Sequence, residues 1–269
     1  MKRMFCFTLD DNIQFFEEIC RNESASIFDC AYLGMLKRCH NRFGCKVQLN
    51  MFYSYAPGTF SLAEVPGRYR EEFEKNAGWL KLSFHARHND PPFPYEFDQE
   101  ALARDYLDVT CELLRIAGTR SLAKTTTLHY AAATAEGCEF LRQSGVRGLI
   151  GMFYSREGRE ALHYHLPPSE WNDLRSGSFY LDQRTGMCFA HNDLILNQHS
   201  LSSALQQLRE LDGLVAKRVH VPFVQLMTHE QYFYPGYQDY QPDFEEKIAA
   251  ALAFLGCAGY TSCFLEELL

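Results

Sequence analysis

Two adjacent acids end the first apolar segment of the chain. Residues 4–9 (Met-Phe-Cys-Phe-Thr-Leu) form a short apolar run that stops at Asp10 and Asp11 and is followed by helix-forming residues. This pattern predicts a buried parallel strand that carries both carboxylates at its carboxyl end. Neighbouring carboxylates repel each other, so they need a cation, a proton or strong hydration between them. In the alternative interpretation, Asp10 or Asp11 caps the following helix, because Asp is a favoured N-cap residue.

Further polar residues stand at the ends of four later segments with strand patterns. They are His85, His88 and Asn89 after residues 79–84, His129 within 123–130, His191 and Asp193 within 187–193, and His229 after 219–227. In a parallel barrel the carboxyl ends of the strands share one rim, so these side chains are expected to converge on one pocket. Carboxylates and imidazoles together suit Zn²⁺ or another divalent transition metal, which can acidify a bound water and polarise a carbonyl group. One such histidine is more often a structural residue, but five such strand endings favour a site.

Strand and helix patterns alternate along the chain and would position these residues. The predicted strands are 4–12, 46–53, 79–84, 123–130, 147–154, 187–193 and 219–227, and the predicted helices are 13–19, 26–43, 67–76, 98–117, 134–144, 200–214 and 243–255. This alternation predicts an α/β fold with a parallel barrel or wound sheet, formed by one domain over residues 1–269. Residues 155–186 are polar and turn-rich, which indicates an insertion that could form a hairpin over a cleft.

Composition excludes several classes of partner. The 269 residues include 26 Lys and Arg against 34 Asp and Glu, a net charge of −8, and no basic run that could neutralise phosphates, so no nucleic-acid role is expected. No apolar stretch is long enough to span a membrane. The apolar run behind Met1-Lys2-Arg3 is too short for a secretion signal, and the ten scattered cysteines suit buried free thiols, so a cytoplasmic location is expected.

Four segments also carry motifs in a fixed order. They are Thr8-Leu9-Asp10-Asp11-Asn12, Phe84-His85-Ala86-Arg87-His88-Asn89, the stretch from Thr127 to Arg147, and Leu226-Met227-Thr228-His229. In this order they resemble the Thr-Phe-Asp-Asp-Gly, His-x-x-x-His, Arg-Pro-Pro-Tyr and Leu-x-His motifs of the NodB-like polysaccharide deacetylases. That resemblance implies a distorted (β/α) barrel of about seven parallel strands. It also implies that Asp10 is the general base, Asp11 and His85 are metal ligands, and His229 is the general acid.

The second histidine of the resembled ligand pair is displaced in this sequence. Its position is held by Asn89, whereas His88 comes one residue earlier. We expect His88 to complete the ligand set, because imidazole binds transition metals better than an amide does and Pro91-Pro92 favours a turn. A straight strand ending would instead present Asn89. The arginine of the Arg-Pro-Pro-Tyr motif, which orients the base, is absent.

The remaining candidates are His129, His191 and Asp193, as alternative ligands or substrate-binding residues. The resemblance implies a metal-dependent hydrolase, with a carbohydrate N- or O-deacetylase as the first hypothesis and a small-molecule or oligosaccharide carbohydrate as its substrate. The expected metal is Zn²⁺, with Co²⁺, Ni²⁺ or Fe²⁺ as alternatives. Two other functions stay open: a catalytically degenerate barrel that binds carbohydrate or assists assembly, and a metal-dependent amidohydrolase acting on a substrate other than a sugar.

Overall fold

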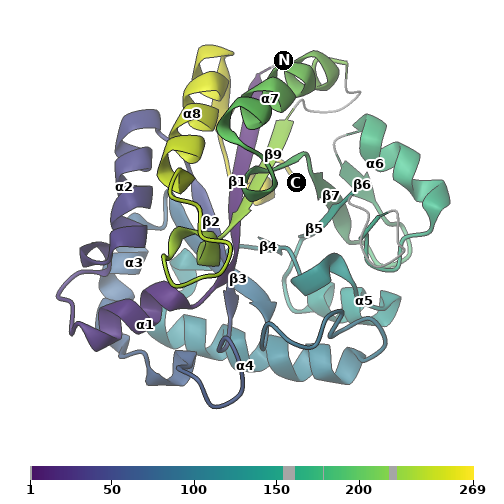
Figure 1. Cartoon of the computed structure of the whole chain (residues 1–269). Helices are drawn as coiled ribbons and strands as arrows, with labels where there is room; N and C mark the ends of the chain where they lie inside the picture. Colours follow the sequence, from purple (N-terminus) through teal and green to yellow (C-terminus); the bar gives the residue numbers. More distant parts are fainter. Residues whose placement is uncertain (1, 154–160, 178, 218–222) are drawn as a thin grey trace.

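Strands form the centre of the molecule and helices surround them (Figure 1). The computed structural model describes residues 2–153, 161–177, 179–217 and 223–269. The strands are β1 (Arg3–Asn12), β2 (Val47–Phe52), β3 (Leu80–Ala86), β4 (Thr125–Thr126), β5 (Gly148–Met152), β6 (Phe179–Leu181), β7 (Cys188–Asn192), β8 (Leu194–Ile195), β9 (Phe223–His229) and β10 (Tyr260–Ser262). The helices are α1 (Gln14–Arg21), α2 (Ala31–Phe43), α3 (Arg70–Asn76), α4 (Gln99–Ala117), α5 (Ala135–Gln143), α6 (Trp171–Gly177), α7 (Leu201–Val215) and α8 (Phe244–Cys257).

The strands pair as two mostly parallel sheets. One has the order β3-β2-β1-β9-β8, with β10 also pairing with β1, and the other has the order β4-β5-β7-β6. A bridge between Leu82 of β3 and Leu122, just before β4, links the two sheets. Among the strands in the described part of the chain, only β6 runs antiparallel to its neighbour, β7. The carboxyl ends of the parallel strands therefore lie on the same side, as the sequence predicts.

The faces of β1 separate an apolar layer from a polar interior. Phe5, Phe7 and Leu9 belong to the large core that packs the helices against the strands. The alternate residues point the other way, because successive side chains of a strand face opposite sides. Among them, Thr8 accepts a hydrogen bond from Gln225 of β9 at 3.2 Å. This buried polar interior leads along β1 to Asp10.

The predicted α/β fold is confirmed, and each of the seven predicted strands corresponds to an observed one. The segment 123–130 forms only the short strand Thr125–Thr126, because the chain turns at His129–Ala131. The predicted insertion at 155–186 lies outside the described residues at 155–160 and 178; its described part contains α6 and β6. The beginning of the predicted strand 219–227 also lies outside them. No helix in the described ranges is long and apolar enough to cross a membrane.

Candidate active site

A bulge in β1 turns the two adjacent acids toward one cleft. The register with β2 pairs Leu9 with Leu49 but Asn12 with Met51, so β1 contains one extra residue between these points. Asp11 takes a left-handed backbone conformation with φ of 63°. Neighbours on a regular strand face opposite sides, and a bulge changes that direction. Asp10 and Asp11 consequently both line a cleft of about 1230 Å³.

The buried side chain of Asn12 holds this bulge in place. Its Nδ2 donates to the carbonyl oxygens of Leu9 at 2.6 Å and of Asn50 at 3.0 Å. Its Oδ1 accepts a hydrogen bond from the hydroxyl of Tyr32 at 2.9 Å. The asparagine therefore satisfies backbone groups that the extra residue takes out of the regular ladder.

Helix α1 is capped by a distant residue and not by the acidic turn. The side chain of Glu230 is fully buried. Its Oε2 accepts hydrogen bonds from the backbone N–H groups of Ile13 at 2.6 Å and Gln14 at 2.8 Å. Its Oε1 accepts a hydrogen bond from the backbone N–H of Phe15 at 2.7 Å. These are donors at the start of a helix that has no side-chain cap of its own. The capping interpretation of Asp10 and Asp11 is therefore wrong, and both carboxylates face the cleft.

We predict that Glu230→Gln lowers the free energy of unfolding by about 2 kcal/mol, because one of its two acceptor oxygens becomes an N–H₂ group facing N–H donors. Urea unfolding measures this loss. Glu17→Gln is the matched control: Glu17 lies on the same helix in a partly exposed ion pair with Arg21, and its loss should cost less than about 0.5 kcal/mol. Equal losses in the two variants would show that the Glu230 cap contributes nothing particular to stability.

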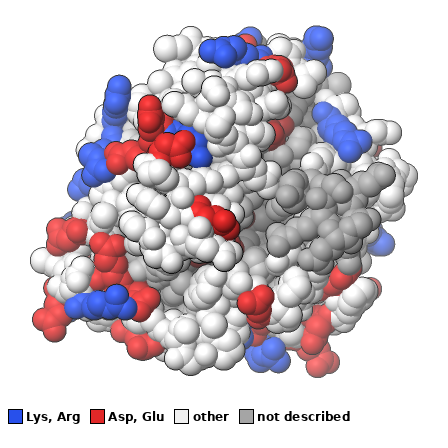
Figure 2. Space-filling model, viewed as in Figure 1, with Lys and Arg blue, Asp and Glu red and all other residues white. Residues whose placement is uncertain are grey.

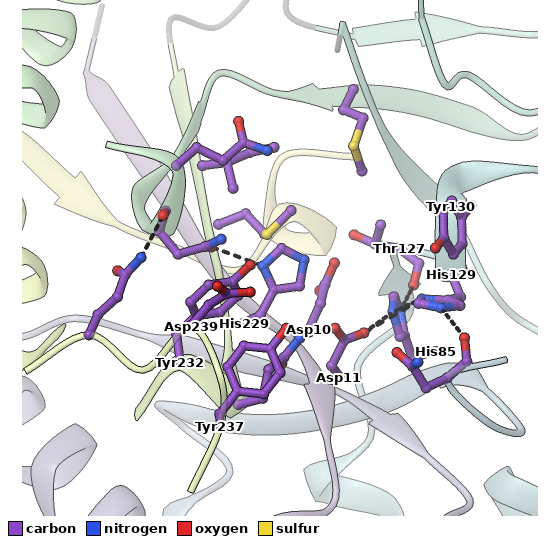
Figure 3. A pocket seen from close by; sticks show the side chains of 18 of the residues that line it. Asp10, Asp11, His85, Thr127, His129, Tyr130, His229, Tyr232, Tyr237 and Asp239 are labelled. Carbon is purple, nitrogen blue, oxygen red and sulfur yellow. Dashed lines mark hydrogen bonds and ion pairs between the residues drawn. The ribbon is translucent and has the colours of Figure 1, made fainter. Parts of the chain in front are cut away.

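Asp11, His85 and His129 form a compact cluster of potential metal ligands (Figure 3). Oδ1 of Asp11 lies 3.0 Å from Nε2 of His85 and 3.5 Å from Nδ1 of His129, and the two ring nitrogens are 3.2 Å apart. All three residues are buried. Gln231 Nε2 donates to the other carboxylate oxygen of Asp11 at 2.7 Å, which fixes the orientation of the carboxylate.

Backbone carbonyls anchor the far side of both imidazoles. Nδ1 of His85 donates to the carbonyl oxygen of Thr127 at 2.5 Å, and Nε2 of His129 donates to that of Asn89 at 2.8 Å. In its neutral form, each ring therefore directs its other nitrogen, with a lone pair, at the partner ring and at Asp11. Two lone pairs and a carboxylate oxygen repel unless a proton or a metal lies between them. Histidine ligands of metals are commonly oriented by such carbonyl contacts.

The spacing of the three atoms fits a transition-metal ion. A tetrahedral Zn²⁺ with bonds of about 2.0–2.1 Å separates its ligand atoms by about 3.3 Å. The observed separations of 3.0, 3.2 and 3.5 Å bracket that value. Two imidazole nitrogens and one carboxylate oxygen also form a common ligand set for catalytic zinc. The cluster therefore has the chemistry and the dimensions of a metal centre with a position open to the cleft.

His129 reaches the cluster through a left-handed turn. Tyr130 and Ala131 have φ of 60° and 46°, so the chain turns sharply directly after His129. His88, the expected third ligand, lies outside the cluster: its Nδ1 bonds to the hydroxyl of Ser54 at 2.9 Å and approaches the Ser54 carbonyl oxygen at 3.3 Å. The chain bends at Arg87 and Asn89 after β3, the His88 ring contacts Ser54 in the loop after β2, and His129 is the third member of the cluster.

Asp10 and His229 lie on the other side of Asp11 (Figure 3). They face each other across the register of β1 and β9. Asn50 Nδ2 donates to Oδ1 of Asp10 at 2.6 Å. Nδ1 of His229 donates to Oδ1 of Asn197 at 2.9 Å, and Nε2 of Gln241 donates to the backbone carbonyl oxygen of Asn197 at 2.7 Å. A buried carboxylate and an imidazole thus flank the cluster of potential ligands from one side.

The electrostatic environment shifts the pKa values of Asp10 and Asp11 in opposite directions. Burial raises the pKa of Asp10, although His85 and His229 nearby oppose that effect. Burial would also raise the pKa of Asp11, but its hydrogen bond with His85 and the surrounding imidazoles hold it well below its usual value. Burial lowers the pKa of His129 to about 4, so that ring is neutral at pH 7. For His85, the two carboxylates outweigh burial and raise the pKa. Asp11 thus suits a permanently charged ligand, and Asp10 suits a group that accepts a proton.

The other predicted residues have different places. Asn89 lines the cleft and contributes its carbonyl oxygen to His129, while its side chain donates to Asp90. His191 and Asp193 are not among the described residues that line the cleft. They contact each other at 3.1 Å, and Asp193 accepts the backbone N–H of Gln225 at 2.9 Å, which ties the end of β7 to β9.

Sequence reasoning missed several residues of the site. They are Asn50, Asn197, Glu230, Gln231 and the tyrosines that line the cleft, Tyr55, Tyr130, Tyr232 and Tyr237. Glu230, Gln231 and Tyr130 carry a local signal, because the first two directly follow His229 and Tyr130 directly follows His129. The others come from loops and strands whose approach to the site depends on the tertiary fold.

Comparisons with known proteins identify the fold. No protein-family model and no curated protein matches the sequence. Among solved structures, 4-alpha-glucanotransferase from Thermococcus litoralis matches the whole chain with a TM-score of 0.58 and 13% identity, and the chain spans 40% of that protein's length. A protein from Mycobacterium smegmatis assigned to the polysaccharide deacetylases matches 99% of the chain and 88% of its own length, with a TM-score of 0.51 and 12% identity. The predicted resemblance to the NodB-like deacetylases is thereby confirmed at the level of the fold.

Proposed function

We propose that this chain, which shares its fold with NodB-like polysaccharide deacetylases, is a metal-dependent hydrolase that removes an N- or O-acetyl group from a carbohydrate. The observation that carries the proposal is the convergence of two imidazole nitrogens and one carboxylate oxygen within 3.5 Å, beside a buried carboxylate and a third imidazole. Asp11, His85 and His129 would hold the metal. Zn²⁺ is the proposed ion, and Co²⁺, Ni²⁺ and Fe²⁺ are accepted by the same donor types.

The chain's own residues would supply the proton transfers. When bound, a divalent metal acidifies water and polarises an acyl carbonyl. Asp10 would accept the proton of the attacking water, because its buried carboxylate has a raised pKa and is oriented by Asn50. The water oxygen then bonds to the acyl carbon, the carbon–nitrogen or carbon–oxygen bond breaks, and acetate leaves. His229, oriented by Asn197, would donate the proton that the departing amine or alkoxide needs.

The walls of the cleft support a carbohydrate substrate. Tyr55, Tyr130, Tyr232 and Tyr237 line it, and each presents an apolar ring with a polar tip, which suits a sugar with C–H faces and hydroxyl groups. None of the described residues that line the cleft is a Lys or an Arg. On the face shown in Figure 2, blue side chains lie mainly toward the edges. These features favour a neutral sugar over one that carries a phosphate or carboxylate group.

Acetate release before and after metal removal tests this function. The purified protein is treated with a chelator, reloaded with Zn²⁺, and assayed on acetylated mono- and oligosaccharides and on acetylated amines that are not sugars. We expect acetate from a sugar substrate only in the reloaded protein. Release from the non-sugar amines alone would favour an amidohydrolase. Metal binding without any release would favour a carbohydrate-binding protein on a degenerate barrel. Undiminished release after complete metal removal would contradict the proposal.

His229→Ala should lower kcat by about 10²–10⁴-fold, the contribution of one general acid, while metal content stays unchanged. Asn197→Leu should also lower kcat, but by a smaller factor. It removes the acceptor at 2.9 Å that orients the His229 ring, while the imidazole itself stays in place. The assay is acetate release beside metal analysis of each variant. An unchanged rate in His229→Ala would remove this residue from the mechanism.

A further inference from the structure

Two of the ten cysteines lie in direct contact, away from the candidate active site. Sγ of Cys6, on β1, is 3.5 Å from Sγ of Cys263, which directly follows β10, although the two residues are 257 positions apart. Both side chains are buried, and both are free thiols in the structure. Neither cysteine lines the cleft. They belong instead to a small apolar cluster with Ile150, Ala190, Phe223 and Leu265.

The backbone brings the two thiols side by side. β1 and β10 pair in parallel with Phe5 opposite Ser262, so Cys6 and Cys263 are the next residues along the two strands. The N–H of Cys263 donates to the carbonyl oxygen of Phe5 at 2.9 Å, which extends this pairing. Neighbouring strands lie about 4.8 Å apart, and disulfides join residues whose Cα atoms are about 4.4–6.8 Å apart. The two sulfur atoms can therefore reach bonding distance through side-chain rotation, without a shift of either strand.

The segment that carries Cys263 lies across the amino ends of neighbouring strands. Glu266 forms an ion pair with Lys81, the second residue of β3, and Glu267 forms one with Lys46, directly before β2, at 2.6 Å. The strand β10 itself has only three residues. A covalent bond between Cys263 and β1 would therefore strengthen the attachment of this segment, in addition to its ion pairs and its short strand.

We propose that Cys6 and Cys263 form a site of disulfide formation, with a low-molecular-weight disulfide such as oxidised glutathione as the oxidant, and that the bond fastens residues 260–267 to β1. One thiolate of the pair attacks the glutathione disulfide, which gives a mixed disulfide and releases one glutathione. The second thiolate then attacks the protein sulfur of the mixed disulfide and releases the other glutathione. Two protein thiols become one disulfide, and their two electrons and two protons pass to glutathione.

Burial controls when this reaction takes place. It raises the pKa of the Cys6 thiol well above its usual value, and the contact with Cys263 adds to this effect. The thiolate is the form that attacks a disulfide, and both side chains are only 2% exposed in the folded protein. The bond should therefore form quickly while the chain folds and slowly once it has folded. The same burial then protects the bond from reductants.

Refolding in two redox buffers tests this site. The full chain is unfolded in urea with a reductant and refolded with either a mixture of reduced and oxidised glutathione or dithiothreitol. In a second arm, the folded protein is incubated with the glutathione mixture for several days. Remaining thiols are alkylated, and mass spectrometry of proteolytic peptides identifies every cross-link. We expect a Cys6–Cys263 peptide in most of the chains refolded with glutathione, and a slower accumulation of the same peptide in the second arm.

The cross-link should raise the melting temperature by about 5–10 °C relative to the protein kept in dithiothreitol, because it restricts the unfolded chain. Cys263→Ala and Cys6→Ala should each lose this rise. Cys138→Ala is the matched control and should keep it, because Cys138 is also a buried thiol but is not part of the pair. Absence of the Cys6–Cys263 peptide from both arms, or a cross-link that does not raise the melting temperature, would overturn the proposal. Neither readout uses metal binding or acetate release, so the result is independent of the proposed function.

Discussion

Asp11→Ala should lower the affinity of the protein for Zn²⁺ by at least about 100-fold, because it removes the only carboxylate among the three convergent ligands. The remaining pair, Nε2 of His85 and Nδ1 of His129, would then hold a dication in a buried site with no carboxylate among its protein ligands. Competition with a chromophoric chelator at constant pH measures the affinity. The loss of the bulged Asp11 should not unfold the chain, since Asn12 and Tyr32 hold the bulge independently.

Two histidine variants provide the matched comparison for this result. His129→Ala should weaken Zn²⁺ binding about as much as Asp11→Ala does, whereas His88→Ala should leave the affinity unchanged, because the His88 ring bonds to Ser54. If His88→Ala weakened Zn²⁺ binding and His129→Ala had no effect, the ligand set expected from the sequence would be restored. Equal affinity in wild type and Asp11→Ala would remove the carboxylate from the centre.

Asp10→Asn should abolish most of the turnover and leave the metal bound. The substitution preserves the shape of the side chain but removes its ability to accept a proton, and a single general base contributes about 10²–10⁴-fold to the rate. Metal content should stay at the wild-type level, because Asp10 is not part of the ligand cluster. Acetate release and metal analysis on the same preparation separate the two effects. A rate within about threefold of wild type would assign the base to another group, and loss of the metal would make Asp10 a ligand.

The fold could be predicted because its elements have clear local patterns. β1 is an apolar run that ends abruptly in polar residues, and α4 begins at the cap Asp98 and ends at Gly118, which the sequence marks directly. The short strands β6, β8 and β10 were missed, because two or three residues carry no periodicity. Helix α6, within the predicted insertion, was missed for a similar reason: it spans only two turns.

Residues of the candidate site could be predicted only where they stand at the regular carboxyl end of a strand. Asp10, His85 and His229 lie at the carboxyl ends of β1, β3 and β9 and line one cleft, as the rule for parallel strands predicts. Their individual roles stay predictions. Asp11 joins them only through the bulge, which depends on the register of β1 against β2 and therefore on residues about 40 positions away.

The choice between His88 and His129 depended on backbone conformations that residue types do not specify. Tyr130 and Ala131 adopt left-handed conformations, which the tertiary structure imposes on them, since neither residue type favours positive φ. That turn brings His129 to within 3.2 Å of His85, 44 residues earlier in the chain. The sequence placed His129 only among the alternative ligands. Glu230 could likewise not be recognised as the cap of α1, because more than 200 residues separate the carboxylate from its donors.

The most direct measurement is an anomalous-difference map from crystals of the protein grown with Zn²⁺ and recorded on both sides of the zinc absorption edge. The account predicts one strong peak between Asp11 Oδ1, His85 Nε2 and His129 Nδ1, about 2.0–2.1 Å from each nitrogen, with an open position toward the cleft between Asp10 and His229. It also predicts no peak beside His88. A peak ligated by His88 or Asn89 instead of His129, or a cluster that stays free of metal at saturating Zn²⁺, would contradict it.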